Sequence, residues 1–430
     1  MGLAISRTAF ILLLVWVLVL TSGPNLVQAG EPPAEIWSKT YGAKYDAETT
    51  SLVQTSDGGY ALAGSANFGV GGDDFWLVKT DNSGSVLWNQ TYGNLYNDAA
   101  TCVIQTTDGG YALAGNGFAN LVKTDSEGVQ QWAMQYDMGS ANYVIQTSDG
   151  GYAIAGRSRY VNSFMLVKVY ANGTQQWYRN FVHHPYEYAN SVVQTSDGGY
   201  ALAGETWSYD PGIQDYHVDS WLIKTDGFGN AQWNETYGGT VSENAIQVVQ
   251  ASDGGYVMAG YIRSPGIGDY FWLTKTDLAG NMEWRQTYGD VGYNWPCRMA
   301  PTSDGGYVIV GWSDPSDIGQ YNYVLLVKTD SDGNMQWSKR YGEPKIDGWI
   351  NCVIQTSDDG YALAGSIRPS ENASYDFWLM KTDAYGEVPE FPSVPVLSLF
   401  MILATLLVFS MSLARRPHVK LRRMGCSSSS

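Results

Sequence analysis

The chain has 430 residues, with 25 Lys or Arg and 42 Asp or Glu, so its formal net charge is −17 at pH 7. An acidic chain lacks the basic surface that nucleic acids and anionic lipid headgroups need, which excludes both as partners of the main domain. Its four cysteines do not form the regular pattern of a disulfide framework, so a hydrophobic core must hold the fold together.

The first segment has the layout of a secretory signal peptide. Arg7 precedes the apolar run 9–20, and the small residues Val27 and Ala29 stand at the −3 and −1 positions of a cleavage site. We expect residues 1–29 to be removed on export. An uncleaved N-terminal anchor is the alternative, although the run is short for a membrane span.

From residue 54 onwards the chain repeats one sequence unit seven times. A strand that contains Trp37 stands alone before the first of these repeats. Comparable strands follow the first six repeats, whereas the seventh repeat ends without one. Their tryptophans are Trp88, Trp132, Trp177, Trp233, Trp284 and Trp337. If each repeat forms one blade of a ring, the strand around Trp37 can supply the strand that the seventh repeat lacks. We predict that it completes this last blade and closes the ring by non-covalent pairing within the chain. Such closure would also remove exposed sheet edges.

The repeat itself begins with QTSDGGYALAG at residues 54–64 and returns with small changes along the chain. Its aspartates are Asp57, Asp108, Asp149, Asp197, Asp253, Asp304 and Asp358. A period of roughly 50 residues is typical of repeat architectures. Each unit contains four short runs of β composition, and the Asp-Gly pair favours a hairpin turn between the first two. The sequence therefore predicts an all-β fold, a seven-bladed β-propeller over residues 30–388.

The two faces of the predicted ring differ in how much the repeats vary. The SDGG and KTD-x-x-G turns are nearly constant and share one face, whereas the links between second and third strands and between blades vary and share the other. Variable loops on a fixed scaffold commonly carry function. The ligand-binding candidates on this variable face are Trp207, Tyr209, Asp215, Tyr216, Asp219, Asp269, Tyr270, Trp295, Trp312, Asp314 and Trp349. Aromatic rings beside carboxylates suit sugar rings, and packing between blades is their alternative role.

Other residues are candidates for metal binding and modification. His183, His184 and His217 lie in the loops beside the fourth repeat and are candidate metal ligands, although no metal-binding spacing is present. We predict no cofactor; a structural cation such as calcium is an option that we leave open. No catalytic motif occurs, so no catalytic residue is assigned. The glycosylation candidates are Asn89, Asn172, Asn234 and Asn372.

The C-terminal end predicts a membrane anchor. Residues 389–393 form a linker with the motif Pro-Glu-Phe, and residues 394–414 are uncharged and long enough to span a bilayer as a helix. The basic tail 415–430 would stay in the cytoplasm. We therefore expect an exported, single-pass membrane protein whose N-terminal domain is extracellular.

Three family resemblances extend this interpretation. SDGGYALAG and the following WLVKTD-x-x-G-x-x-x-W resemble tandem repeats of quinoprotein-like propellers in bacterial and archaeal surface proteins, which implies that the tryptophans dock each blade on the next. The phrase is also similar to the Asp-box hairpin of sialidase-like propellers. Quinone chemistry is not implied, because the chain lacks the adjacent cysteine pair and the eighth blade of quinoprotein dehydrogenases. The Pro-Glu-Phe motif, apolar span and basic cluster resemble an archaeal sorting signal, which implies processing by a membrane transpeptidase; a retained transmembrane helix is the alternative.

These observations lead to one expected function and two alternatives. We expect a surface-anchored propeller that binds carbohydrate or protein through the variable face and is not an enzyme. An extracellular carbohydrate-active enzyme would need two loop carboxylates across a cleft. An architectural component of a surface coat would need no soluble ligand.

Overall fold

The computed structural model describes most of the predicted propeller. The described residues are 37–69, 71–184, 186–210, 215–239, 241–264, 268–289, 292–315, 323–341, 347–368 and 373–387. The predicted signal peptide, linker, transmembrane segment and basic tail lie outside these ranges, as does Asn372. Within the described ranges, no helix has the length and hydropathy that a membrane crossing requires.

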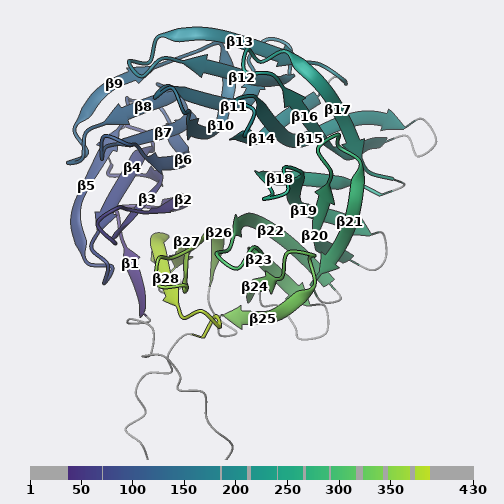
Figure 1. Ribbon diagram of the computed structural model, residues 1–430. Coiled ribbons are helices and arrows are strands. Elements are labelled where there is room, and N and C mark those ends of the chain that lie inside the picture. The colour runs from purple at the N-terminus through teal and green to yellow at the C-terminus, as the bar shows by residue number, and fades with distance from the viewer. Residues whose placement is uncertain are drawn as a thin grey trace, which may run out of the picture. The chain divides into compact units, whose positions relative to one another are not determined.

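The described chain folds into seven four-stranded antiparallel blades around a central axis (Figure 1). The innermost strands are β2 (Ala47–Gln54), β6 (Ala99–Gln105), β10 (Met138–Gln146), β14 (Tyr186–Gln194), β18 (Glu243–Gln250), β22 (Gly292–Pro301) and β26 (Asp347–Gln355). The second strands are β3 (Tyr60–Ala66), β7 (Tyr111–Asn116), β11 (Tyr152–Ser158), β15 (Tyr200–Asp210), β19 (Tyr256–Ser264), β23 (Tyr307–Pro315) and β27 (Tyr361–Arg368).

The outer half of each blade is a second hairpin. The third strands are β4 (Asp74–Thr80), β8 (Leu121–Thr124), β12 (Phe164–Val169), β16 (Asp215–Thr225), β20 (Gly268–Thr276), β24 (Tyr323–Thr329) and β28 (Asp376–Thr382). The outermost strands are β5 (Val86–Tyr92), β9 (Gln130–Met134), β13 (Gln175–Phe181), β17 (Ala231–Tyr237), β21 (Met282–Tyr288), β25 (Met335–Tyr341) and β1 (Trp37–Tyr41). A single parallel bridge between Gly268 and Gly292 also joins blades 5 and 6.

The predicted closure of the ring is confirmed. Strand β1 pairs antiparallel with β28, in a register that runs from Trp37 opposite Lys381 to Tyr41 opposite Phe377. The first described strand of the chain is therefore the outermost strand of the last blade. The prediction of an all-β, seven-bladed propeller is confirmed with it.

In each blade, the aspartate of the repeated phrase forms a hydrogen-bonded ion pair with a lysine of the third strand. We call this ion pair the lock; the sequence did not predict it. In blade 3, Asp149 Oδ1 accepts hydrogen bonds from the Thr147 hydroxyl at 2.5 Å and from the Gly151 amide at 3.1 Å. The Lys168 ammonium, on the third strand, lies 2.9 Å from Asp149 Oδ2, and its side chain is 5% exposed. Burial opposes ionisation of Asp149, but the bonds from Thr147 and Lys168 prevail and lower its pKa to about 2. Every blade has this pair, because a buried ammonium needs a counter-charge.

A tryptophan packs each blade against the next. The ring of Trp132, on β9, meets that of Tyr152, on β11, edge-on at 6.0 Å. The same indole covers Gly173, where an added Cβ would lie 3.0 Å from it, and Tyr136 donates a hydrogen bond to the Gly173 carbonyl at 2.8 Å. Equivalent Trp–Tyr contacts at 5.7 to 5.9 Å are made by Trp37, Trp88, Trp177, Trp233 and Trp337, and Trp284 lies over Gly333.

Candidate functional site

Blade 4 departs most from the repeat on the variable face. Its second and third strands, β15 and β16, each have 11 residues, and their pairing continues to Asp210 opposite Asp215 (Figure 1). Successive side chains of a strand point to opposite faces of the sheet. The extension of this hairpin beyond the packed core therefore presents two distinct surfaces to its surroundings.

One surface carries a cluster of aromatic rings. Tyr186 is paired with Trp207, and Tyr209 with Tyr216, so all four side chains share one face of the sheet. The Tyr216 ring centroid lies 5.9 Å from that of Tyr186, 6.3 Å from Trp207 and 5.6 Å from Tyr209. Tyr186, Tyr209 and Tyr216 are 41%, 57% and 42% exposed. We call these four residues the aromatic platform.

A carboxylate lies at the base of the aromatic platform. Glu205 precedes Trp207 by two residues and so belongs to the same face. The side-chain amide of Asn244, on β18 of the next blade, donates a hydrogen bond to Glu205 Oε2. Burial raises the pKa of Glu205 above its ordinary value. The base of the platform thus combines an amide and a carboxylate from two neighbouring blades.

The opposite surface of blade 4 gathers the three candidate histidines. His217 Nε2 lies 3.2 Å from Asp219 Oδ1, and the His183 ring stacks on Trp221 at 5.5 Å. Burial raises the pKa of Asp219, and His217 opposes that rise. Burial and the neighbouring His184 lower the pKa of His183.

The described contacts of these histidines are with a carboxylate, an aromatic ring and one another. The backbone amides of His183 and His184 both donate to Glu187 Oε1, so the contact of this buried carboxylate with them is through the main chain. Across the described residues, no group of three His, Cys, Asp or Glu side chains has the arrangement of a metal site. The sequence placed the three histidines in the loops beside the fourth repeat but could not show how their side chains are directed.

The remaining ligand-binding candidates are distributed over other blades. Asp269 is buried and lies 3.6 Å from Arg263 Nε, so this carboxylate is paired. Trp295 and Trp312 face each other across β22 and β23. Trp349 packs on Tyr375 at 4.4 Å. Tyr270 and Asp314 are half-buried, and the side chain of Asp215 lies outside the described part. Only Trp207, Tyr209 and Tyr216 of the candidate set are brought into one cluster by the described contacts.

Three residues of the platform region were missed by sequence reasoning. Tyr186 begins the innermost strand of blade 4, Glu205 lies on its long second strand, and Asn244 belongs to the blade that follows. The alternation Glu205, Trp207, Tyr209 was a usable signal, because residues two apart in a strand share a face. Asn244 reaches the platform only because blade 5 packs beside blade 4, and no pattern in the sequence around Asn244 indicates this contact.

Two depressions lie at the boundary between blades 5 and 6. One, of 490 Å³, is on the face of the constant turns and is lined by Asp253, Lys275, Glu283 and Pro301 among others. The sequence predicted that face to be uniform, and here it is not. In the other blades, the Gln that begins the repeated phrase accepts a hydrogen bond from the backbone amide of a Ser or Thr in the preceding blade, as Gln355 does from Ser303 at 2.6 Å. Pro301 replaces that Gln in blade 6 and has no side-chain amide to offer.

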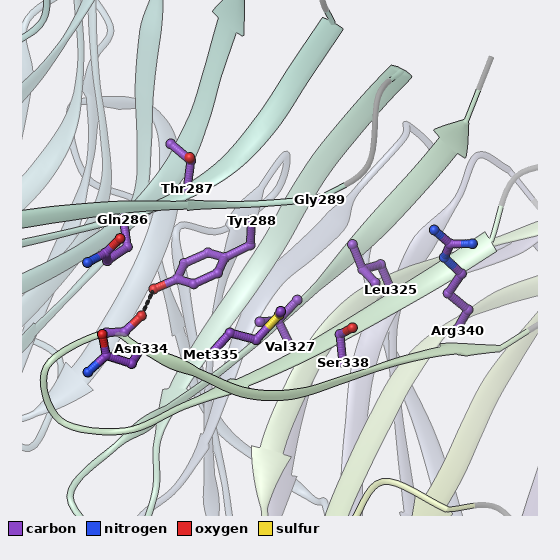
Figure 2. Close-up of a pocket in the computed structure, with 11 residues that line it drawn as sticks. Gln286, Thr287, Tyr288, Gly289, Leu325, Val327, Asn334, Met335, Ser338 and Arg340 are labelled. Carbon is purple, nitrogen blue, oxygen red and sulfur yellow. Dashed lines mark hydrogen bonds between the residues drawn. The ribbon is translucent and has the colours of Figure 1, made fainter. Parts of the chain in front are cut away.

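The second depression is on the rim, between β21 and the outer hairpin of blade 6. It has a volume of 520 Å³ and polar lining residues that include Gln286, Ser338 and Arg340. Figure 2 shows Tyr288 directed towards the turn before Asn334, where its hydroxyl donates to the Gly333 carbonyl at 2.6 Å. Because blades diverge from the axis, such a groove is expected between their outer strands, and its residues serve the docking of the blades.

Comparisons with known proteins identify the fold and no family. No protein-family model matches the sequence, and no curated protein matches it significantly. The WD40 repeats of RRP9 align with 81% of this chain and 98% of their own length, with 11% identity and a TM-score of 0.54. A catalytically inactive virginiamycin B lyase from Staphylococcus aureus, solved with quinupristin, aligns with 80% and 99%, with 8% identity and a TM-score of 0.53. At these identities the likeness shows the propeller fold alone.

Proposed function

We propose that the protein is a carbohydrate-binding module that acts through the aromatic platform of blade 4. The observation that carries this proposal is the gathering of Tyr186, Trp207, Tyr209 and Tyr216 on one face of a hairpin that extends beyond its neighbours. Propellers commonly serve as binding modules, and here the departure from the repeat coincides with the aromatic cluster.

The chemistry of the platform suits a sugar better than a flat apolar partner. Aromatic faces offer area to the C–H faces of a pyranose, while the phenol hydroxyls of Tyr186, Tyr209 and Tyr216 can bond its hydroxyl edges. Glu205 and Asn244 supply an acceptor and a donor at the base. The tyrosines are already in mutual contact, which reduces the conformational entropy lost on binding.

A binding role is also better supported than hydrolysis. Among the candidate loop carboxylates, Asp219 is paired with His217, and Asp269 lies beside Arg263. A glycosidase needs two carboxyl groups facing each other across the scissile bond. Among the described side chains, Glu205 is the carboxylate at the base of the platform, and one carboxylate can position a sugar hydroxyl without cleaving the chain.

The proposed setting is the outside of a cell membrane. The signal peptide and the apolar C-terminal span predicted from the sequence would export the propeller and anchor it. Asn89, Asn172 and Asn234 are all exposed, as glycan acceptors must be, which supports this proposal. A protein displayed in this way would capture polysaccharide at the cell surface.

Binding of the full-length protein to a panel of immobilised polysaccharides tests the proposal. We expect Trp207→Ala and Tyr209→Ala to weaken retention at least about tenfold, because each removes one face of the platform. Tyr170→Ala is the matched control, since Tyr170 is an exposed tyrosine in a turn of the constant face. Unchanged retention by both platform variants, or equal loss in the control, would contradict the assignment. Release of new reducing ends would instead favour the carbohydrate-active enzyme.

A further inference from the structure

The innermost strands place seven equivalent side chains around the central axis. Each of these strands has a register shift at the same point, and the residue after the shift faces the same position of the second strand. The residues are Ser51, Cys102, Tyr143, Ser191, Gln247, Arg298 and Cys352. We call them the channel ring. All except Ser191 line a cavity of 250 Å³ on the axis.

The channel ring contains one charge and no counter-charge. Arg298 is its only ionic member, and no Asp or Glu belongs to the lining of the cavity. The Arg298 guanidinium lies over the Tyr143 ring at 5.1 Å and within reach of the Cys352 thiol. Among the described residues, no carboxylate forms an ion pair with it. Arg298 is half-buried at this cavity. A charge partly removed from water is costly unless it is paired, so an anion in the cavity would stabilise this guanidinium.

The oxygen atoms of Ser51 and Gln247 are already used as acceptors. Ser51 Oγ accepts a hydrogen bond from the Val103 amide at 3.0 Å, and Gln247 Oε1 accepts from the Met299 amide at 2.9 Å. The Ser51 hydroxyl is also hydrogen-bonded to the Cys102 side chain, and the Gln247 amide group to the Tyr143 hydroxyl. The acceptor atoms thus join neighbouring blades, and at least one of the two amide hydrogens of Gln247 is left to donate beside the guanidinium.

No thiol or phenol of the ring ionises at neutral pH to supply a negative charge beside Arg298. Burial raises the pKa of the Cys102 and Cys352 thiols, although Arg298 opposes the rise. Burial likewise raises the pKa of the Tyr143 hydroxyl to about 12. These groups keep their protons at neutral pH, so the charge of Arg298 is not neutralised from within the ring.

We propose that the channel ring binds a small monovalent anion, halide or short carboxylate, at the Arg298 guanidinium. Guanidinium and amide donors are the groups that carboxylates and halides prefer in proteins. The cavity volume admits an ion of this size and excludes a polysaccharide. The site is separate from the aromatic platform and does not depend on the sugar-binding proposal.

Thermal unfolding of the full-length protein at constant ionic strength tests this site. Chloride or acetate would replace gluconate, which is too bulky for the ring, between about 1 and 100 mM, because a ligand that binds only the native state raises the midpoint as its concentration exceeds the dissociation constant. We expect a saturable rise for the native protein and none for Arg298→Met. Arg159→Met, which removes an exposed arginine on blade 3, should retain the rise. A native protein without an anion-dependent midpoint would overturn the proposal.

A second variant and a direct measurement keep the test decisive if Arg298→Met does not fold. Gln247→Glu keeps the acceptor for the Met299 amide and adds a carboxylate beside Arg298. We expect this variant to unfold at a higher temperature without added anion and to have lost the response to chloride. Chloride-35 line broadening on the native protein should be reversed by acetate. Absence of broadening, or a full chloride response in Gln247→Glu, would refute an anion at this site.

Discussion

The closure of the ring by β1 leads to the prediction that Trp37→Ala both destabilises the propeller and makes it associate. The Trp37 indole meets the Tyr60 ring edge-on at 5.7 Å and covers Gly84. Tyr41, at the other end of β1, donates to the Gly84 carbonyl at 2.8 Å. Strand β1 is joined to the ring covalently only through β2, so its pairing with β28 depends on these contacts.

The magnitude follows from burial. Removal of a fully buried tryptophan side chain costs about 3–5 kcal/mol, and Trp37 is only half-buried, so we expect a loss of about 2–3 kcal/mol in the free energy of unfolding. Trp132→Ala should cost a similar amount, because its contact with Tyr152 at 6.0 Å has the same geometry. Strand β9, however, is held by the chain at both ends, whereas release of β1 exposes the edge of β28.

Urea unfolding and analytical ultracentrifugation separate the two effects. Both variants should unfold at lower urea than the native protein, but only Trp37→Ala should form concentration-dependent oligomers. Leu87→Ala, at a position of β5 that is 57% exposed, is the control and should change stability by less than about 0.5 kcal/mol. An unchanged urea midpoint for Trp37→Ala, or equal association of Trp132→Ala, would refute the conclusion that the ring is closed by the pairing of β1 with β28.

Two further predictions concern the lock in the repeated phrase. Asp57, Asp108, Asp149, Asp197 and Asp304 each have a folded pKa of about 2, below the ordinary 3.8, so their contribution is complete above pH 4 and should be lost as pH falls towards 2. Glu205, Asp219 and Asp269 have raised pKa values, so their ionisation lowers the stability of the fold as pH rises. Thermal midpoints should therefore be highest in mildly acidic solution. A midpoint that rises steadily to pH 8 would contradict this expectation. Blade 5 has Ala251 where the other blades have threonine, and Ala251→Thr should raise the free energy of unfolding by about 1 kcal/mol while Thr302→Ala lowers it by as much, as urea unfolding would measure. Equal stability of both variants would show that the threonine bond contributes nothing.

The sequence predicted the architecture because the same strand and turn signals occur in each of the seven repeats. The alternation of short strands, the Asp-Gly turns and the isolated strand around Trp37 were enough to predict blade number and closure. The lock between Asp149 and Lys168 was present in the same data, since both residues occur in every repeat. It was missed because a lysine at a strand end is usually exposed, and only the blade geometry shows that its ammonium is buried.

The candidate site was predicted less well, for a geometric reason. Aromatic composition marked the variable face but could not show that Trp207 and Tyr216 lie on one surface of β15–β16 while His217 lies on the other. That division follows from strand register, and a shift of one residue would exchange the two surfaces. The register was not fixed by any turn signal in the sequence, because the hairpin of blade 4 is much longer than a tight turn requires.

The repeat also explains where distinct chemistry can arise in such a ring. Positions that dock one blade on the next, such as Trp132, or that hold a blade together, such as Lys168, must be alike in every blade because each makes the same contact. A ligand on the axis, by contrast, meets equivalent positions from all blades at once, and it can be held in one orientation only if those positions differ. The channel ring meets that condition with serine, cysteine, tyrosine, glutamine and arginine at one level. Differences between copies at a structurally equivalent position are therefore a better guide to binding in this protein than the phrase that all copies share.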